Sequence, residues 1–367
     1  MEQLANDTLD LAVRIQQIPA PTFSEAARAA FVCDRFRELG LVDLEIDELS
    51  NVYARLPSAD PDKQPPLVVS AHLDTVFPET TPLDVIRENG RISGPGIGDN
   101  SLAVAGLVGL ARMVLEIPEP LPGDLWLVAN AGEEGLGNLC GMRRVVDRFG
   151  KVPAAYVVLE GTALGHVYHR GLSVRRFEIS VRTAGGHSWG HFGRPSAIHI
   201  LAKIIAQLTE LDLPSEPRSS YNAGPISGGT TVNTIAAEAA VQLDLRSESE
   251  DYVEILVGNV AAIVEEFRSE EVQVDLAPIG NRPGGEVSAD HPLVKLAMRS
   301  LEDLGIAPTL KIGSTDANVP LSRGLPAICI GLTEGGGGHT VSEYILTDPL
   351  KQGLNHVFNV ILGVWKM

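Results

Sequence analysis

The sequence predicts an α/β protein, with helices on both faces of a mixed sheet, interrupted by a smaller α+β domain. Short apolar runs alternate with helical patterns over residues 1–172 and again over residues 281–367, as in a sheet covered by helices. Between them, residues 173–280 alternate apolar and polar positions, which is typical of half-exposed antiparallel strands. We therefore expect a larger domain of residues 1–172 and 281–367, and an inserted domain of residues 173–280.

The first part of the larger domain is predicted to begin with two helices. Residues 4–18 repeat apolar positions with a helical period. Thr22-Phe-Ser-Glu is typical of a capping box, which would open a second helix ending near Gly40. Residues 102–115 are apolar on most sides and predict a buried helix, and another is expected around 138–148. Strands of this part are expected at residues 44–47 and 51–56, and short apolar runs predict further strands at 67–71, 125–129 and 156–159.

The inserted domain has its own order of elements. Helical patterns cover residues 195–210 and 251–268. Strands are expected at residues 173–182, near 221–235, at 237–246 and at 272–278. The order strand-helix-strand-strand-helix-strand is that of a ferredoxin-like unit. After Pro283-Gly-Gly the earlier pattern returns, with helices at 290–304 and from about 348, and strands at 309–312 and 327–331.

Composition excludes several classes of protein. The formal net charge of −18 argues against a nucleic-acid binder, which would show a basic face. The three cysteines have no paired spacing, which favours a reducing compartment, and the contexts of Cys33 and Cys329 predict buried thiols. The polar, acidic start predicts no signal peptide, and no apolar run predicts a membrane span. We expect a cytoplasmic protein.

His72 and Asp74 are the first candidate site residues. His72 follows the apolar run at 67–71. A carboxylate two residues later suits a metal-binding histidine, because it accepts the other ring N–H and raises the basicity of the ring. A histidine at a strand end is equally often structural. The polar residues that follow other apolar segments strengthen the interpretation of this pair as part of a metal site.

Three glutamates follow the other predicted strands. Glu133 and Glu134 come after the strand at 125–129, and Glu160 follows the strand at 156–159. Ligands of open α/β sheets bind beyond the carboxyl ends of strands. Of two adjacent carboxylates, one can bind a metal while the other acts as general base. The alternative interpretation of Glu133 and Glu134 is a solvated acidic pair.

Asp99 and His339 lie in glycine-rich loops. Asp99 precedes the helix at 102–115, and His339 follows four glycines, which let the backbone approach a site closely. The alternatives are a helix-capping carboxylate and an incidental loop histidine. Histidine and carboxylate ligands suit Zn²⁺, with Co²⁺ or Mn²⁺ as substitutes. Two histidines and three carboxylates can hold two ions if one carboxylate bridges them.

A series of motifs runs through nearly the whole chain: Ser70-Ala-His-Leu-Asp-Thr, Gly96-Ile-Gly-Asp-Asn, Asn130-Ala-Gly-Glu-Glu-Gly, Leu159-Glu-Gly, Gly185-Gly-His-Ser, Thr231-Val-Asn-Thr-Ile, Leu243-Asp-Leu-Arg and Gly338-His-Thr-Val-Ser-Glu. This series resembles the co-catalytic zinc peptidases and deacylases, which include aminoacylase, carboxypeptidase G, succinyl-diaminopimelate desuccinylase and the tripeptide aminopeptidases. The resemblance implies a zinc-peptidase-like catalytic domain interrupted by a lid and dimerisation domain.

The resemblance also implies a role for each residue. It implies that His72 and Glu160 bind one metal, that Glu134 and His339 bind the other, and that Asp99 binds both. It also implies a cis peptide bond after Asp99. It makes Asp74 the residue that orients His72, and Glu133 the general base. In the lid it makes His187, Asn233 and Arg246 the groups that polarise the scissile carbonyl or hold a substrate carboxylate. In dimeric members that histidine reaches the neighbouring subunit.

Two segments depart from the pattern of this family. Asn100-Ser101 stands where many relatives have Lys-Gly. Residues 188–195 are longer and more aromatic than usual, so Trp189 and Arg194 are candidate substrate contacts, the alternative being a packed loop.

The sequence thus favours a dinuclear zinc amidohydrolase that cleaves small peptides or N-acyl amino acids. Glu160 resembles the carboxypeptidase and deacylase branches. The alternative is a di- or tripeptide aminopeptidase, because Gly313-Ser-Thr-Asp-Ala is similar to tripeptidases. A non-catalytic metal-binding scaffold is a third possibility, against which Glu133 argues, since a scaffold needs no base. The expected cofactors are two Zn²⁺ per chain, and the expected partner is a second copy through the lid.

Overall fold

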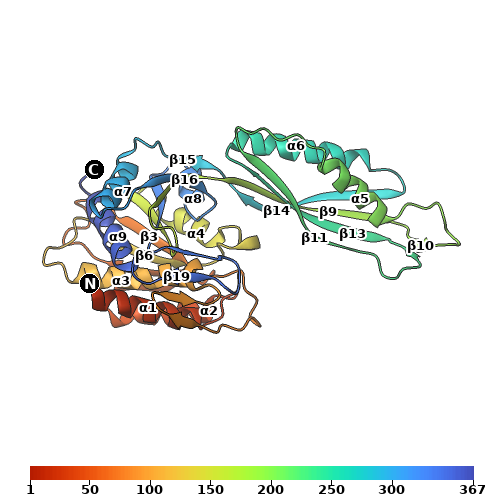
Figure 1. Ribbon diagram of the computed structural model, residues 1–367. Coiled ribbons are helices and arrows are strands. Elements are labelled where there is room, and N and C mark those ends of the chain that lie inside the picture. The colour runs from red at the N-terminus through yellow and green to blue at the C-terminus, as the bar shows by residue number, and fades with distance from the viewer. The chain divides into compact units, whose positions relative to one another are not determined.

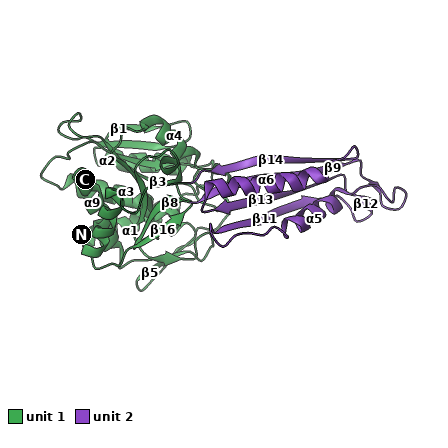
Figure 2. Cartoon of the chain, turned by 90° about the horizontal axis from the view of Figure 1, so that it is seen from above, with its two compact units in different colours: residues 1–171, 285–367 green, residues 172–284 purple.

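A computed structural model describes residues 1–367, which divide into two compact units. The larger unit comprises Met1–Gly171 and Gly285–Met367, and the inserted unit comprises Leu172–Gly284 (Figure 2). Each unit has its own hydrophobic core.

A mixed sheet forms the centre of the larger unit (Figure 1). The strands run in the order β1 (Val42–Ile46), β2 (Val52–Leu56), β6 (Leu125–Asn130), β3 (Leu67–His72), β7 (Ala155–Glu160), β17 (Ala327–Gly331), β8 (His166–Gly171) and β15 (Gly285–Glu286), and β16 (Thr309–Gly313) pairs with β8. β3 is parallel to both β6 and β7, whereas β2 is antiparallel to β6. The carboxyl ends of β3, β6 and β7 therefore meet at one edge.

Helices cover both faces of this sheet, as predicted. They are α1 (Glu2–Gln16), α2 (Ala26–Glu38), α3 (Ala103–Leu115), α4 (Cys140–Phe149), α7 (Pro292–Asp303), α8 (Asn318–Ser322) and α9 (Leu350–Val364). Every residue of β3 is buried. Because side chains of a strand point alternately to its two faces, this burial requires cover on each face. α3 packs on β3, β6 and β7, and α1 and α9 pack against α3.

A small second sheet lies beside the first and was not predicted. Its order is β18 (Gly335–Gly336), β19 (Tyr344–Leu346), β5 (Arg91–Ser93) and β4 (Ile86–Glu88). The pairing of β19 with β5 brings together two loops that are far apart in the sequence. One loop follows β5 and leads into the short helical segment η1 (Ile97–Leu102), and the other connects β18 to β19.

The inserted unit has the predicted ferredoxin-like order. Its elements are β9 (Ser173–Thr183), β10 (Gly186–His187), α5 (Ala197–Leu208), β11 (Ser219–Gly228), β12 (Thr234–Ile235), β13 (Glu238–Ser247), α6 (Glu250–Glu266) and β14 (Val272–Arg282). The antiparallel sheet runs β11-β13-β9-β14, and α5 and α6 both pack on β9 and β13 (Figure 1). β10 and β12 form a separate pair.

The capping box predicted at Thr22 is wrong. Helix α2 starts at Ala26, with Glu25 at its N-cap position and no side-chain cap. The hydroxyl of Thr22 instead donates to Asp74 Oδ2 at 2.9 Å. A short-range sequence pattern cannot reveal this partner, because the competing acceptor comes from a distant strand end.

One apolar helical run has the length of a membrane span, Ile97–Leu115, but 89% of its apolar window is buried inside the protein. It is the core helix that the sequence predicted. Cys33 and Cys329 are buried thiols, also as predicted, and no cysteine forms a disulfide.

Candidate metal centre and active site

The edge where β3, β6 and β7 end carries the candidate site. His72 is the last residue of β3 and Glu160 the last of β7. Glu133 and Glu134 lie in the loop after β6. This arrangement places ligands where open α/β sheets usually bind them.

Two further candidates come from the loops that the small sheet joins. Asp99 lies in η1, where its backbone is not helical, and the peptide bond from Asp99 to Asn100 is cis, as the resemblance implied. His339 lies between β18 and β19 with φ of 63°, a left-handed conformation that is uncommon for a residue other than glycine. The neighbouring glycines let the backbone turn sharply there.

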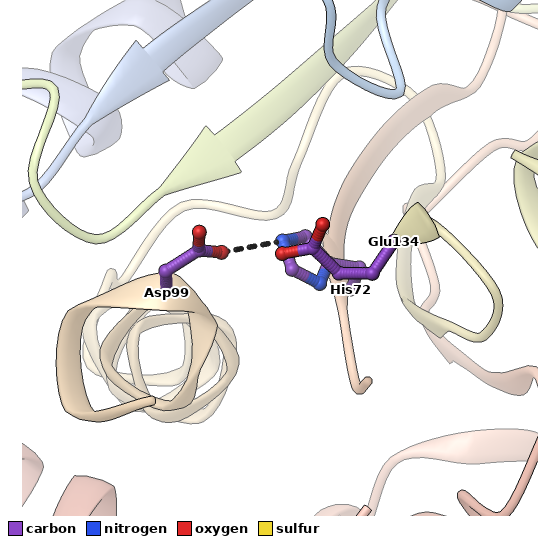
Figure 3. A group of neighbouring side chains, drawn as sticks. All are labelled: His72, Asp99 and Glu134. Carbon is purple, nitrogen blue, oxygen red and sulfur yellow. Dashed lines mark ion pairs between the residues drawn. The ribbon is translucent and has the colours of Figure 1, made fainter. Parts of the chain in front are cut away.

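Asp99 lies between the two histidines, one at each carboxylate oxygen. Oδ1 is 3.1 Å from His72 Nε2, and Oδ2 is 3.1 Å from His339 Nε2. Glu134 Oε1 lies 3.2 Å from His339 Nε2, and Glu160 Oε2 lies 3.8 Å from His72 Nε2. Figure 3 shows how His72, Asp99 and Glu134 converge. The five predicted ligands therefore come together, with the other four gathered around the carboxylate of Asp99.

These distances fit a metal site. Ligand atoms of His72, Asp99 and Glu134 all lie within 4.8 Å of one another. Zinc binds such atoms at about 2.0–2.1 Å in a tetrahedron, so neighbouring ligand atoms are about 3.3 Å apart. The measured separations of 3.1–3.8 Å bracket that value. The donor set suits two ions that share Asp99.

The electrostatics of the cluster also favour a cation. Burial alone would lower the pKa of His72, but contacts with Asp74, Asp99 and Glu160 hold that pKa well above its ordinary value. Hydrogen bonds to Asp99 and Glu134 raise the pKa of His339 to about 10. The carboxylates thus create a strongly negative potential around both rings, which a bound metal ion would relieve.

The same crowding affects the carboxylates themselves. Burial opposes ionisation of Asp99, yet His339 and His72 together hold its pKa well below the usual range. Burial, together with the nearby charges of Asp99 and Asp316, raises the pKa of Glu160 to about 7 against the opposing effect of His72.

Asp74 links the strand that ends in His72 to the loop that carries the two glutamates. The ring Nδ1 of His72 lies 3.0 Å from the backbone carbonyl of Asp74 and 3.6 Å from its carboxylate. The carboxylate is fully buried and accepts hydrogen bonds from the backbone N–H groups of Glu133 and Glu134, each at 2.9 Å. Asp74 therefore orients His72 through its carbonyl and the glutamate loop through its side chain.

Glu343 is a buried carboxylate to which the sequence reasoning assigned no role. Its Oε1 accepts from the backbone N–H groups of Gly98 at 2.6 Å and Asp99 at 2.7 Å, and its Oε2 accepts from Gly96 at 3.2 Å. Glu343 therefore holds the loop that presents Asp99. Its position four residues after His339 was the available signal.

Two polar pairs behind the cluster were also missed. Asn130 Nδ2 donates to Asp316 Oδ2 at 2.7 Å, beside His72 in the sheet. Asn100, which departs from the family pattern, donates to the carbonyl of Leu159 at 3.0 Å and accepts from the N–H of Gly161 at 3.0 Å. Asn100 thereby holds both neighbours of Glu160.

The remaining candidates lie in the inserted unit. His187 is on β10, and Asn233 directly precedes β12; the backbone N–H of Ser188 donates to the carbonyl of Asn233 at 3.0 Å. The structure thus brings His187 and Asn233 together. Strand β13 begins at Glu238, and Arg246 lies eight residues further along it. The two residues are therefore roughly 27 Å apart along the strand.

Arg246 is therefore not a neighbour of His187 within this unit. Its Nε donates to Asp244 Oδ1 at 2.5 Å, and its backbone pairs with Val174, near the point where the chain enters the unit. Trp189 and Arg194 lie in the loop after His187, and Trp189 is 88% exposed. Their proposed contacts with substrate stay predictions.

Comparisons with known proteins agree with this arrangement. The family described as Peptidase family M20/M25/M40 matches residues 68–362. The succinyl-diaminopimelate desuccinylase of Nitrosospira multiformis is 26% identical over 382 aligned residues, which cover 95% of this chain and 96% of that protein.

Two solved structures share the fold. A tripeptidase of Staphylococcus aureus has a TM-score of 0.82 at 21% identity, with 99% of each chain covered. A dinuclear metal-binding peptidase of Bacillus subtilis has a TM-score of 0.71 at 16% identity, covering 100% of this chain and 99% of that one. Because the family match spans most of the chain and contains all five converging ligands, the chain belongs to peptidase family M20/M25/M40, a family of hydrolases that act on amide bonds.

Proposed function

We propose that the protein is a dinuclear zinc amidohydrolase that cleaves the amide bond of a small peptide or an N-acyl amino acid. The observation that carries the proposal is the position of Asp99, whose two carboxylate oxygens each lie 3.1 Å from a different histidine. His72 and Glu160 would hold one ion, and Glu134 and His339 the other, with Asp99 shared. Paired ions, when bound, polarise a carbonyl and lower the pKa of water.

In the proposed mechanism Glu133 is the general base. Its carboxylate removes a proton from the attacking water and later delivers that proton to the nitrogen of the leaving amine. The hydrogen bond from its backbone N–H to Asp74 supports this role, because it restrains the loop from which the carboxylate acts. His187 donates a hydrogen bond to the developing oxyanion, and Asn233 and Arg246 bind the substrate.

We favour a carboxypeptidase or deacylase over an aminopeptidase. The favoured branch rests on the resemblance at Glu160, and the desuccinylase relative is consistent with it. The alternative, a di- or tripeptide aminopeptidase, draws on the tripeptidase-like segment at Gly313. An N-acetyl amino acid has no free amino terminus. A deacylase can therefore hydrolyse it, whereas an aminopeptidase cannot.

We further propose that two copies associate through the inserted unit, acting as a lid and dimerisation domain, in the cytoplasm. β11 is an edge strand that is exposed along most of its length, with Ile226 63% exposed, and edge strands offer unpaired backbone groups to a second chain. His187 and Arg246 lie far apart within one unit, as expected if they serve different active sites of a dimer. The unpaired cysteines fit a reducing compartment.

Two assays test the proposal. The zinc-loaded protein should release amino acid from N-acetyl-L-alanine or from glycyl-L-alanine, a chelator should abolish release, and added zinc should restore it. Absence of hydrolysis across a panel of both substrate types would overturn the proposal.

The second assay mixes chains in which His187→Ala or Glu133→Gln is the only change. If His187 serves the partner's site, a heterodimer has one site with both defects and one intact site, so activity should partly return. Heterodimers that form without activity would show that His187 serves its own chain.

A further inference from the structure

We propose that His191 is a positioning residue that holds the ring of His187 as a hydrogen-bond donor through Nε2. This inference rests on the proposed function, in which His187 stabilises the oxyanion. It concerns the turn of residues 187–191 in the inserted unit, which follows β10.

Two backbone N–H groups determine the tautomer of the His187 ring. The backbone N–H groups of Trp189 and Gly190 lie 3.2 Å and 3.3 Å from His187 Nδ1, and both donate to it. A backbone N–H can only donate, so Nδ1 must keep its lone pair. The proton of the neutral ring is therefore on Nε2. That tautomer is the one that can donate to an oxyanion from Nε2.

Two hydrogen bonds between His187 and His191 close the turn. The backbone N–H of His187 donates to His191 Nδ1 at 3.0 Å, and the backbone N–H of His191 donates to the carbonyl of His187 at 2.9 Å. These two bonds join the same two residues, and they enclose the N–H groups of Trp189 and Gly190. The side chain of His191 thus supports the geometry on which the ring of His187 depends.

The space for His191 is built into the backbone before it. Gly186 has φ of 147°, and a Cβ added there would lie 2.6 Å from His191 Nδ1. Only glycine leaves room for the imidazole against the chain at this point. The pairing of Gly186 with Ile235 then fixes the start of the turn to β12.

Burial does not explain these contacts. His187 and His191 are exposed, Phe192 is 90% exposed, and the hydrophobic core of the inserted unit contains no residue between 187 and 194. The hydrogen bonds therefore orient a ring at the surface rather than bury apolar area. Such orientation is what an oxyanion donor requires, because a displacement of about 1 Å can cost 10²-fold in rate.

The test compares two substitutions of His191. His191→Asn keeps an acceptor, because Asn Oδ1 occupies nearly the position of His Nδ1, whereas His191→Leu removes it. The exposed His199→Leu is the matched control. We measure kcat and KM for N-acetyl-L-alanine or glycyl-L-alanine, whichever the zinc-loaded protein cleaves, and zinc content. His191→Leu should lower kcat roughly 10- to 100-fold with little change in KM or zinc content, and the other two variants should resemble the unmodified chain.

A second readout does not depend on activity. In the metal-free protein labelled with ¹⁵N-histidine, His187, assigned by its loss in His187→Ala, should show the Nε2–H tautomer. His191→Leu should convert it to a mixture of tautomers, and His191→Asn should not. His191→Leu should also add no loss of kcat in the His187→Ala background, because it acts through that ring.

The outcomes separate the two proposals. If His187→Ala leaves kcat unchanged, the proposed role of His187 fails, whatever His191 does to the tautomer. If His187→Ala lowers kcat while His191→Leu retains normal kcat and the Nε2–H tautomer, the inference about His191 is overturned. Equal losses in His191→Leu and His191→Asn would also overturn it, because the acceptor would then not matter.

Discussion

Asp74 Oδ1 accepts a hydrogen bond from the backbone N–H of Glu133 at 2.9 Å, so a buried carboxylate restrains the residue that we propose as the general base. Its other oxygen accepts from Glu134 N–H and from the hydroxyl of Thr22, each at 2.9 Å. Its backbone carbonyl lies 3.0 Å from the ring of His72. One residue therefore fixes the positions of the proposed base and of two proposed metal ligands.

Asp74→Asn should impair both catalysis and stability. The amide has a single acceptor oxygen, so its NH₂ group must face one of the two backbone N–H groups. We expect kcat to fall roughly 10²-fold and the free energy of unfolding to fall by about 1–3 kcal/mol. Thr22→Val is the matched control, since it removes one hydrogen bond from the same carboxylate and leaves both backbone bonds. Equal kcat in the two variants would show that the backbone bonds do not position the base.

Glu133→Gln should separate proton transfer from metal binding. The amide keeps the size of the side chain but cannot accept a proton, so kcat should fall roughly 10²–10⁴-fold while the zinc content stays unchanged. Glu134→Gln, one residue away, should instead lose zinc, because it removes an anionic ligand. Elemental analysis and steady-state kinetics on both variants distinguish the roles. A fully active Glu133→Gln would remove Glu133 from the mechanism.

Sequence reasoning grouped the part of the cluster that follows predicted strands, whereas Asp99 and His339 lie in loops. His72, Glu133 and Glu160 each come at or just after the end of an apolar run, and parallel strands bring such ends to one edge. The sheet predicted from the short apolar runs is therefore sufficient to place these three residues close together. The roles of the individual residues came from the family motifs.

Contacts across the sequence could not be predicted in this way. Thr22 fits a capping box by local pattern, yet its hydroxyl donates to Asp74, fifty-two positions away. Glu343 supports the Asp99 loop only because β19 pairs with β5. Both depend on tertiary packing, which local propensity does not encode.

Glu343→Gln should weaken metal binding without removing a ligand. The side-chain NH₂ would face backbone N–H groups of the loop from Gly96 to Asp99, which now donate to the carboxylate. Loss of such a supporting contact typically costs 10- to 100-fold in metal affinity, and we expect about that loss here, measured by competition with a chelator. The exposed Glu334→Gln is the control. Unchanged zinc affinity in Glu343→Gln would mean that Asp99 needs no such support.

His356 should make the metal-free protein sensitive to acid. Burial lowers the pKa of His356 to about 4 from its ordinary 6.5. Above pH 6.5 the ring is neutral in both the folded and the unfolded chain, so His356 takes nothing from the free energy of unfolding. As the pH falls from 6.5 towards 4, the unfolded chain binds a proton that the folded chain does not, and the free energy of unfolding decreases. Between pH 7.5 and 5 this difference should cost about 2 kcal/mol of unfolding free energy.

Urea unfolding of His356→Leu at both pH values checks this prediction. The variant should lose that part of the pH dependence, whereas His199→Leu should keep it. An identical pH dependence in His356→Leu and the unmodified chain would show that His356 does not titrate as its burial requires.

The number of zinc ions bound per chain is the most direct measure of a dinuclear site around Asp99. The five proposed ligands, Asp99 among them, come from distant segments of the chain, so the folded protein, stripped with chelator and titrated with zinc, should bind two ions per chain. Activity should rise with occupancy, and Asp99→Ala should bind neither ion tightly. Only trace zinc after titration, or full activity without metal, would rule out a dinuclear zinc site in this protein.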